Sequence, residues 1–193
     1  MSELIVEMDE FVCTTDPDTR LITYGISTCI AFAVNGFYIN DDEERVPFAA
    51  LYHWSGFSSE EKDPKGHMKK VMKQFLTNIR DHLYLSTMHP IVLSNFHFIG
   101  GEKEQFNDEG KLLVSGTAKE VNALVYTVEH FGFNKRQFTL ASGATKHSHF
   151  LTDNEDTIDI SVQTNNCDFI LQSTKVSDES SYKDEPKISR RPG

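Results

Sequence analysis

The first third of the chain has short apolar runs and polar/apolar alternation, a pattern typical of β-strands. Three segments rich in β-branched and aromatic residues predict strands there: 3–8, 19–39 and 46–54. A turn built on Asp16-Pro17 precedes the second segment, and an acidic turn over 40–45 precedes the third. Inside the second segment, the dipeptide Asn35-Gly36 predicts a further tight turn. The sequence therefore begins as a β-rich region.

Two later stretches have the periodicity of helices. In the first, apolar residues recur every fourth position: Val71, Phe75, Ile79 and Leu83. The second has a capping box, Thr117 with Glu120, and a stop signal, Gly132. Its apolar stripe consists of Val121, Leu124, Val125 and Val128. The aperiodic polar stretch 55–68 before the first helix predicts a loop.

Strand-like segments separate and follow the helices. They comprise 89–101, 137–163 with a turn over 153–156, and a short run at 166–171. The order of strands, helix, strand, helix and strands predicts the α+β class, as a layered sandwich with two main helices on a mostly antiparallel sheet. We expect one domain over residues 1–172, and residues 173–193, which have little to bury, as a disordered tail.

Composition narrows the possible partners. Asp and Glu outnumber Lys and Arg 29 to 19, for a net charge of −10, which argues against a nucleic-acid partner. The acidic N-terminus does not resemble a signal peptide, and no run of about 18 apolar residues occurs, so we expect a soluble protein without membrane insertion. The cysteines at 13, 29 and 167 are odd in number and lack metal-binding spacing, which favours a reducing compartment over a disulfide framework.

Cys29 lies at a polar kink between two apolar runs, in the sequence LITYGISTCIAF. Rigid flanking strands position such a residue, and backbone N–H groups of a turn can face a developing oxyanion. A thiol nucleophile also needs a base, for which His53 at the end of a strand is the natural candidate. Thr23 could orient that imidazole. On spacing alone, packing as a small hydrophobic residue is the commoner role of a buried cysteine.

The motifs TYGISTC (23–29) and AALYH (49–53) resemble the signature of the chemoreceptor glutamine deamidase CheD family. The resemblance extends through FIGG at 98–101 and the second helix to the strands ending at 163, and implies the layered α/β/β sandwich of that family. Carried over by position, it implies that Cys29 is the nucleophile, His53 its base and Thr23 the residue that orients the base. The turn at Ile26, Ser27 and Thr28 would supply the oxyanion donors. The same Cys-His core recurs in glutamine-deamidating bacterial toxins.

The resemblance implies a protein-glutamine deamidase that forms a thioester on Cys29 and needs no metal or organic cofactor. Its partner would be a protein with a reactive glutamine, and its place of action the cytoplasm, in chemotaxis, or a host cytosol if it is an exported effector. Two alternatives remain. Ser27-Thr28 replace the family's Gly-Ser, and Ala49-Ala50 replace its Gly-Gly, which favours an inactive protein-binding scaffold. The thiol chemistry could also end in transamidation or peptide hydrolysis.

Other residues have simpler interpretations. His147 and His149 would share one face of a strand and could bind a metal, but without a third ligand a surface pair is favoured. His97 could replace His53 as base, although a packed strand histidine is favoured. Cys13 and Cys167 are interpreted as bystanders, and Trp54 as a residue of the core or of the site's rim.

Overall fold

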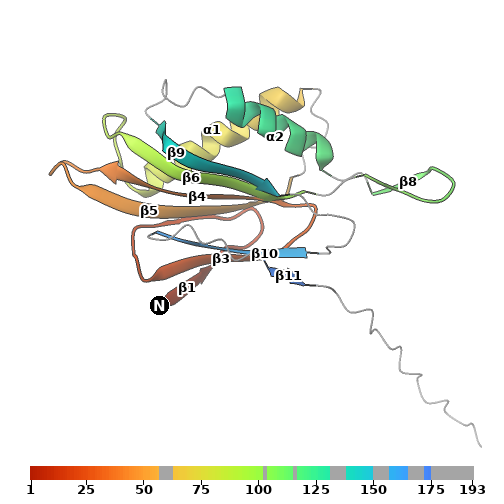
Figure 1. Ribbon diagram of the computed structural model, residues 1–193, viewed down its shortest axis with the longest axis horizontal. Coiled ribbons are helices and arrows are strands. Elements are labelled where there is room, and N and C mark those ends of the chain that lie inside the picture. The colour runs from red at the N-terminus through yellow and green to blue at the C-terminus, as the bar shows by residue number, and fades with distance from the viewer. Residues whose placement is uncertain are drawn as a thin grey trace, which may run out of the picture.

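The computed structural model describes residues 1–56, 63–101, 104–114, 117–130, 138–149, 157–164 and 172–174. Two β-sheets lie face to face, and two helices cover the outer face of the larger sheet (Figure 1). None of the helices in this described part combines the length and the apolar character needed to cross a membrane. The arrangement confirms the α+β class and the two helices that the sequence predicted.

The smaller sheet has the strand order β1-β3-β10-β11 and the larger sheet the order β2-β5-β4-β6-β9. The strands of the smaller sheet are β1 (Ser2–Ile5), β3 (Thr19–Ile26), β10 (Thr157–Gln163) and β11 (Gln172–Thr174). Those of the larger sheet are β2 (Phe11–Thr14), β5 (Arg45–Trp54), β4 (Ile30–Ile39), β6 (Ile91–Gly100) and β9 (Phe138–His149). Most pairs are antiparallel, as predicted, whereas β1–β3 and β6–β9 are parallel.

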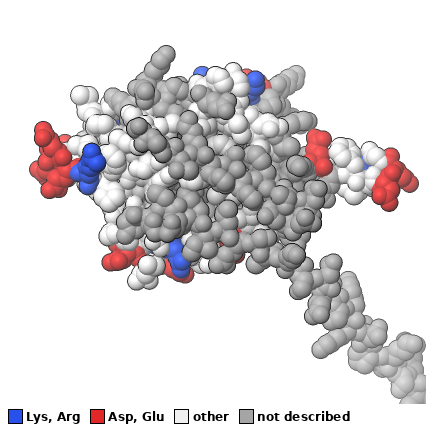
Figure 2. Space-filling model, viewed as in Figure 1, with Lys and Arg blue, Asp and Glu red and all other residues white. Residues whose placement is uncertain are grey.

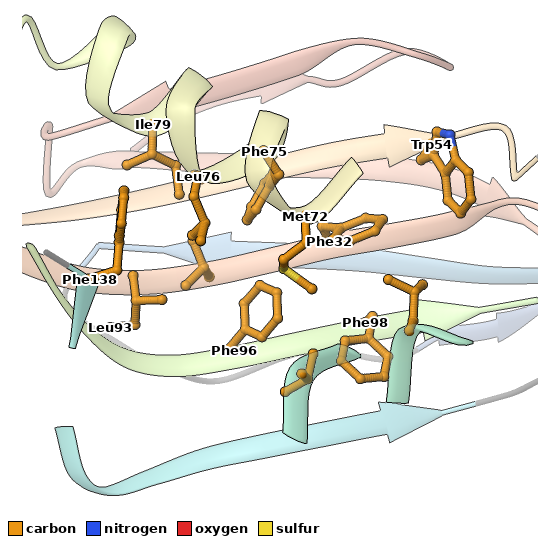
Figure 3. Packing of buried hydrophobic residues seen from close by; sticks show 14 of the residues in the cluster. Phe32, Trp54, Met72, Phe75, Leu76, Ile79, Leu93, Phe96, Phe98 and Phe138 are labelled. Carbon is orange, nitrogen blue, oxygen red and sulfur yellow. The ribbon is translucent and has the colours of Figure 1, made fainter. Parts of the chain in front are cut away.

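The alternation of side chains along β4 and β5 divides the core into two layers. Even-numbered residues such as Phe32 and Trp54 face the helices, where they pack with Phe75 of α1 (Pro64–His82) and with α2 (Ala118–His130) (Figure 3). Odd-numbered residues such as Ala31 and Leu51 face the smaller sheet. Because His53 has the same parity, its imidazole faces the space between the sheets.

A third β element is a hairpin of two short strands between β6 and α2. β7 (Gln105–Phe106) pairs with β8 (Leu112–Val114), and Figure 1 shows the hairpin projecting away from the body of the protein. The sequence patterns predicted no such arm, because its strands are too short to show a period.

Three sequence predictions need correction. Asn35-Gly36 is not a turn but a bulge inside β4: an added Cβ on Gly36 would lie 2.1 Å from the carbonyl oxygen of Val92, so glycine serves close strand packing here. The loop expected over 55–68 ends earlier, because the Asp63 carboxylate caps α1, which begins at Pro64. Ser173 and Thr174, assigned to the tail, pair with β10 in β11.

Several predictions lie outside the described residues. These are the helix stop at Gly132, the turn over 153–156, the short strand at 166–171, Cys167, and the tail from residue 175 onward.

Candidate active site

The candidate site lies at one end of the sandwich, where the chain crosses twice between the two sheets. One crossing is the turn 27–29, which joins β3 of the smaller sheet to β4 of the larger sheet. The other is the segment 6–10 between β1 and β2, which we call the N-terminal strap. His53, the penultimate residue of β5, lies at the same end, because its cross-strand neighbour is Ala31, two residues after Cys29.

Thr23 and His53 are brought together from different sheets. The Thr23 side chain is fully buried, the His53 residue is 6% exposed, and Thr23 Oγ1 lies 2.8 Å from His53 Nδ1. The Thr23 hydroxyl also donates its proton to the carbonyl oxygen of Val6 at 2.8 Å. A hydroxyl has one proton to donate, so Thr23 Oγ1 accepts from Nδ1–H of His53. The neutral imidazole is therefore held in the tautomer whose Nε2 carries the lone pair.

The N-terminal strap holds this pair in place. Its Val6 N–H donates to Ile22 O at 2.7 Å, and its Asp9 N–H donates to His53 O at 2.5 Å. The His53 N–H donates to Glu10 O at 3.1 Å. The strap thus bonds to both sheets, and its path fixes the acceptor that orients Thr23. Nothing in the apolar pattern of 3–8 predicted this role.

Cys29 is half-buried, and its thiol does not contact the base. The thiol instead donates to Met8 Sδ at 3.9 Å, and His53 Nε2 is buried without a hydrogen-bond partner. A Cys–His hydrogen bond is therefore absent in this structure. In enzymes, contacts of this kind often tighten only when substrate binds.

Burial and the nearby carboxylate of Asp9 raise the pKa of Cys29, and the Thr28 hydroxyl offsets this in part. Burial lowers the pKa of His53, although the carboxylates of Asp9 and Glu7 act in the opposite direction. At neutral pH this arrangement favours a neutral thiol beside a neutral imidazole. Cys29 would then be deprotonated by His53 during the reaction rather than exist as a resting thiolate.

The carbonyl groups of the turn 27–29 all point toward the base of the β7–β8 hairpin. Gly101 N–H donates to Ser27 O at 3.1 Å and to Cys29 O at 2.8 Å, while the Thr117 hydroxyl donates to Thr28 O at 2.8 Å. Within the part of the chain that the structure describes, the N–H groups of Ser27 and Thr28 have no acceptor. These two groups can bind an oxyanion. Ile26, also expected to contribute, is the last residue of β3 and pairs with Ile158.

The serine at position 27 is accommodated without backbone strain. The left-handed residue of this region is Gly25 (φ +67°), and the non-glycine residues with positive φ in the described ranges are Asp9, Glu43 and Tyr84. Gly25 lies in the bulge where Ile160 pairs with Thr23 and Ile158 with Ile26. The substitution of Ser27-Thr28 for Gly-Ser is therefore compatible with the turn.

The other histidines and cysteines that the sequence offered as site residues, together with Trp54, lie elsewhere in the fold. His97 is buried on β6 opposite Ala33, further from the turn than Ala31, which faces His53. Cys13 is buried on β2, and burial raises its pKa to about 12. Trp54 packs in the helix-facing core. The side chains of His147 and His149 lie outside the description, and among the described side chains no group of three is arranged to hold a metal ion.

A scan against models of known protein families finds no match for this chain, and a search of curated proteins finds none either. The likeness to the CheD family therefore stays a resemblance, and the function has to be argued from the site.

We expect Cys29 to react with iodoacetamide much faster than Cys13, because Cys29 is half-buried whereas Cys13 is buried and its pKa is raised to about 12.

Asp9→Asn should accelerate the reaction of Cys29 at a fixed pH near 8, because the Asp9 carboxylate raises the pKa of that thiol and its removal increases the thiolate fraction. Peptide mapping by mass spectrometry measures both rates.

The control is Asp42→Asn, which removes the same charge from the exposed turn between β4 and β5 at the opposite end of the sheet. It should leave the rate unchanged. If Asp9→Asn slows the alkylation of Cys29, or if the two variants behave alike, then the Asp9 charge does not govern the thiol.

Proposed function

We propose that this protein is a cysteine-dependent protein-glutamine deamidase. The observation that carries the proposal is the buried Thr23–His53 pair, in which Val6 O fixes the Thr23 hydroxyl and leaves His53 Nε2 as a basic nitrogen without a partner. A strand-end imidazole oriented in this way, beside a turn that carries a half-buried thiol, has the parts of a nucleophile–base pair. The motif resemblance supports the same three residues.

The first half of the proposed reaction forms a thioester. The Cys29 thiol turns from Met8 toward His53, and Nε2 takes its proton as the sulfur attacks the carboxamide carbon of a substrate glutamine. The N–H groups of Ser27 and Thr28 donate to the resulting oxyanion. When the C–N bond breaks, the imidazolium returns the proton to the leaving nitrogen, and ammonia departs.

The second half restores the enzyme. His53 Nε2 takes a proton from a water molecule, whose oxygen attacks the thioester carbon, and the departing sulfur recovers the proton as the C–S bond breaks. The product is glutamate. The steps use protons and side chains alone, so the proposal includes no metal or organic cofactor. Free thiols at Cys13 and Cys29 suit a reducing cytosol, either the cell's own or a host's.

A second candidate is a protein-binding scaffold without catalysis. It is favoured by the thiol that bonds to Met8 instead of His53, and by the raised pKa of Cys29. A third outcome keeps the thioester but transfers it to an amine, which gives a transamidase, or forms it at a peptide bond, which gives a protease.

The test uses benzyloxycarbonyl-glutaminylglycine and measures ammonia release together with the mass of the product. We expect conversion to the glutamate form by the native protein and by Cys13→Ala, and none by Cys29→Ser. Addition of a primary amine distinguishes a transamidase, which would produce the amine adduct. If ammonia release is absent, or if Cys29→Ser retains it, the deamidase proposal is wrong.

A further inference from the structure

The β7–β8 hairpin is joined to the candidate site at both of its ends. The chain leaves β6 at Gly101, whose N–H donates to the carbonyl oxygens of Ser27 and Cys29. It returns at Thr117, whose hydroxyl donates to the carbonyl oxygen of Thr28. Gly101 and Thr117 therefore both form hydrogen bonds to the turn that carries Cys29. A protein segment that extends from the hairpin to its anchored base would reach the turn of Cys29.

The hairpin exposes large apolar side chains. Phe106 and Leu112 are cross-strand partners and are 55% and 46% exposed, while Leu113, at the register shift of the hairpin, is 64% exposed. Because an isolated two-stranded hairpin is marginally stable in water, these residues are typical of an arm that a partner covers.

Charge indicates which partner fits. Within the described residues 104–114 the exposed acidic residues are Glu104, Asp108 and Glu109 and the one cation is Lys111, and Figure 2 shows acidic side chains at the outer end of the projection. Among the described strands, β7 and β8 pair with each other alone, which leaves the outer edge of each without a neighbour. An extended segment can add to such an edge through backbone hydrogen bonds.

We infer that the β7–β8 hairpin is the docking arm for the protein substrate, and that it takes an extended segment with large apolar residues flanked by lysine or arginine. This inference rests on the proposed deamidase function, because it places the substrate glutamine beside Cys29. It adds a substrate class: glutamines in apolar, basic sequence contexts. Apolar contacts would provide the affinity, and the acidic side chains the discrimination between partners.

The test uses three labelled synthetic peptides of equal length, each with one glutamine. One carries leucines and lysines, the second leucines and glutamates, and the third serines and lysines. Binding is followed by fluorescence anisotropy and conversion by mass spectrometry. We expect the leucine–lysine peptide to bind about tenfold more tightly than either of the others. Its affinity should fall as salt is raised.

Phe106→Ser and Leu113→Ser should each weaken this binding about tenfold while leaving the turnover of benzyloxycarbonyl-glutaminylglycine unchanged. The matched control is Met88→Ser, which removes a side chain that is 83% exposed, near the β4–β5 turn where His89 binds Asp41. It should change neither measurement. Asp108→Asn combined with Glu109→Gln should reduce the preference for the lysine peptide over the glutamate peptide.

The outcomes separate this inference from the proposed function. If the leucine–lysine peptide binds through Phe106 and Leu113 but is never converted, the docking arm stands and the deamidase proposal fails. If Phe106→Ser binds and converts the peptide as well as the native protein does, the docking inference is wrong and the deamidase stands. The inference is also overturned if the leucine–lysine peptide does not bind, or if the hairpin mediates only self-association in sedimentation experiments.

Discussion

His53→Ala should lower the rate of glutamine conversion by about 10³-fold, to a level near that of Cys29→Ser. His53 Nε2 is a buried nitrogen without a hydrogen-bond partner, at the end of the sandwich that carries Cys29, and burial together with Asp9 raises the pKa of that thiol. Without the imidazole, the thiol stays protonated at neutral pH and no group protonates the leaving nitrogen. The measurement is kcat/KM for benzyloxycarbonyl-glutaminylglycine, with circular dichroism to check the fold.

Thr23→Val gives a graded test of the same site. The substitution keeps the shape of the side chain but removes the acceptor for His53 Nδ1–H and the donor to Val6 O. The imidazole then loses the contact that selects its tautomer, and we expect a loss of about tenfold rather than complete inactivation. Thr19→Val is the matched control, because Thr19 is a buried threonine on the same strand whose hydroxyl binds Ser2 and Asp16 instead.

The order of damage decides between the catalytic and the structural interpretation of the pair. A catalytic pair requires that His53→Ala be the most damaging change, Thr23→Val intermediate and Thr19→Val close to native. If Thr19→Val and Thr23→Val lose equal activity, the loss reflects stability. If His97→Ala inactivates the enzyme while His53→Ala does not, the base has been misassigned.

The strands that carry the site could be predicted because their patterns are local. The acidic turn over 40–45 sets the register of β4 against β5, which places His53 opposite Ala31. Parity then directs His53 toward the smaller sheet and Trp54 toward the helices. Asn35-Gly36 shows the limit of this reasoning. The same dipeptide suits a turn or a bulge, and the decisive contact, the carbonyl of Val92, is distant in sequence.

The contacts that hold the site could not be predicted from local patterns. The acidic segment VEMDE gives no sign that Val6 O orients Thr23, or that Met8 contacts the thiol of Cys29. Those contacts depend on how the strap crosses between two sheets. Likewise, Gly101 could be recognised as part of a strand end, but its bonds to Ser27 O and Cys29 O join segments more than seventy residues apart. Long-range pairing of this kind leaves no periodic signal.

The sequence predicted Gly100-Gly101 only as the end of a strand. In the structure, these two glycines pack against the turn that carries Cys29. Gly100 has φ +105°, and an added Cβ would lie 2.5 Å from Cys29 O and 2.2 Å from Ile26 Cγ2. Gly100→Ala should therefore combine backbone strain with a steric clash, for a loss of about 3 kcal/mol in the free energy of unfolding. For a chain of this size that corresponds to a fall in Tm of about 10 °C, measurable by calorimetry.

Gly110→Ala separates the cost of backbone strain from the cost of the steric clash. Gly110, in the β7–β8 turn, has φ +76°, but nothing lies within 4 Å of an added Cβ, so this variant has the strain without the clash. We expect a loss of about 1 kcal/mol from it, since the left-handed conformation disfavours alanine. We also expect Gly100→Ala, unlike Gly110→Ala, to reduce the turnover of the small glutamine substrate, because the clash displaces the carbonyl of the nucleophile itself. Equal destabilisation by the two variants, with full activity in both, would show that Gly100 does not support the turn of Cys29.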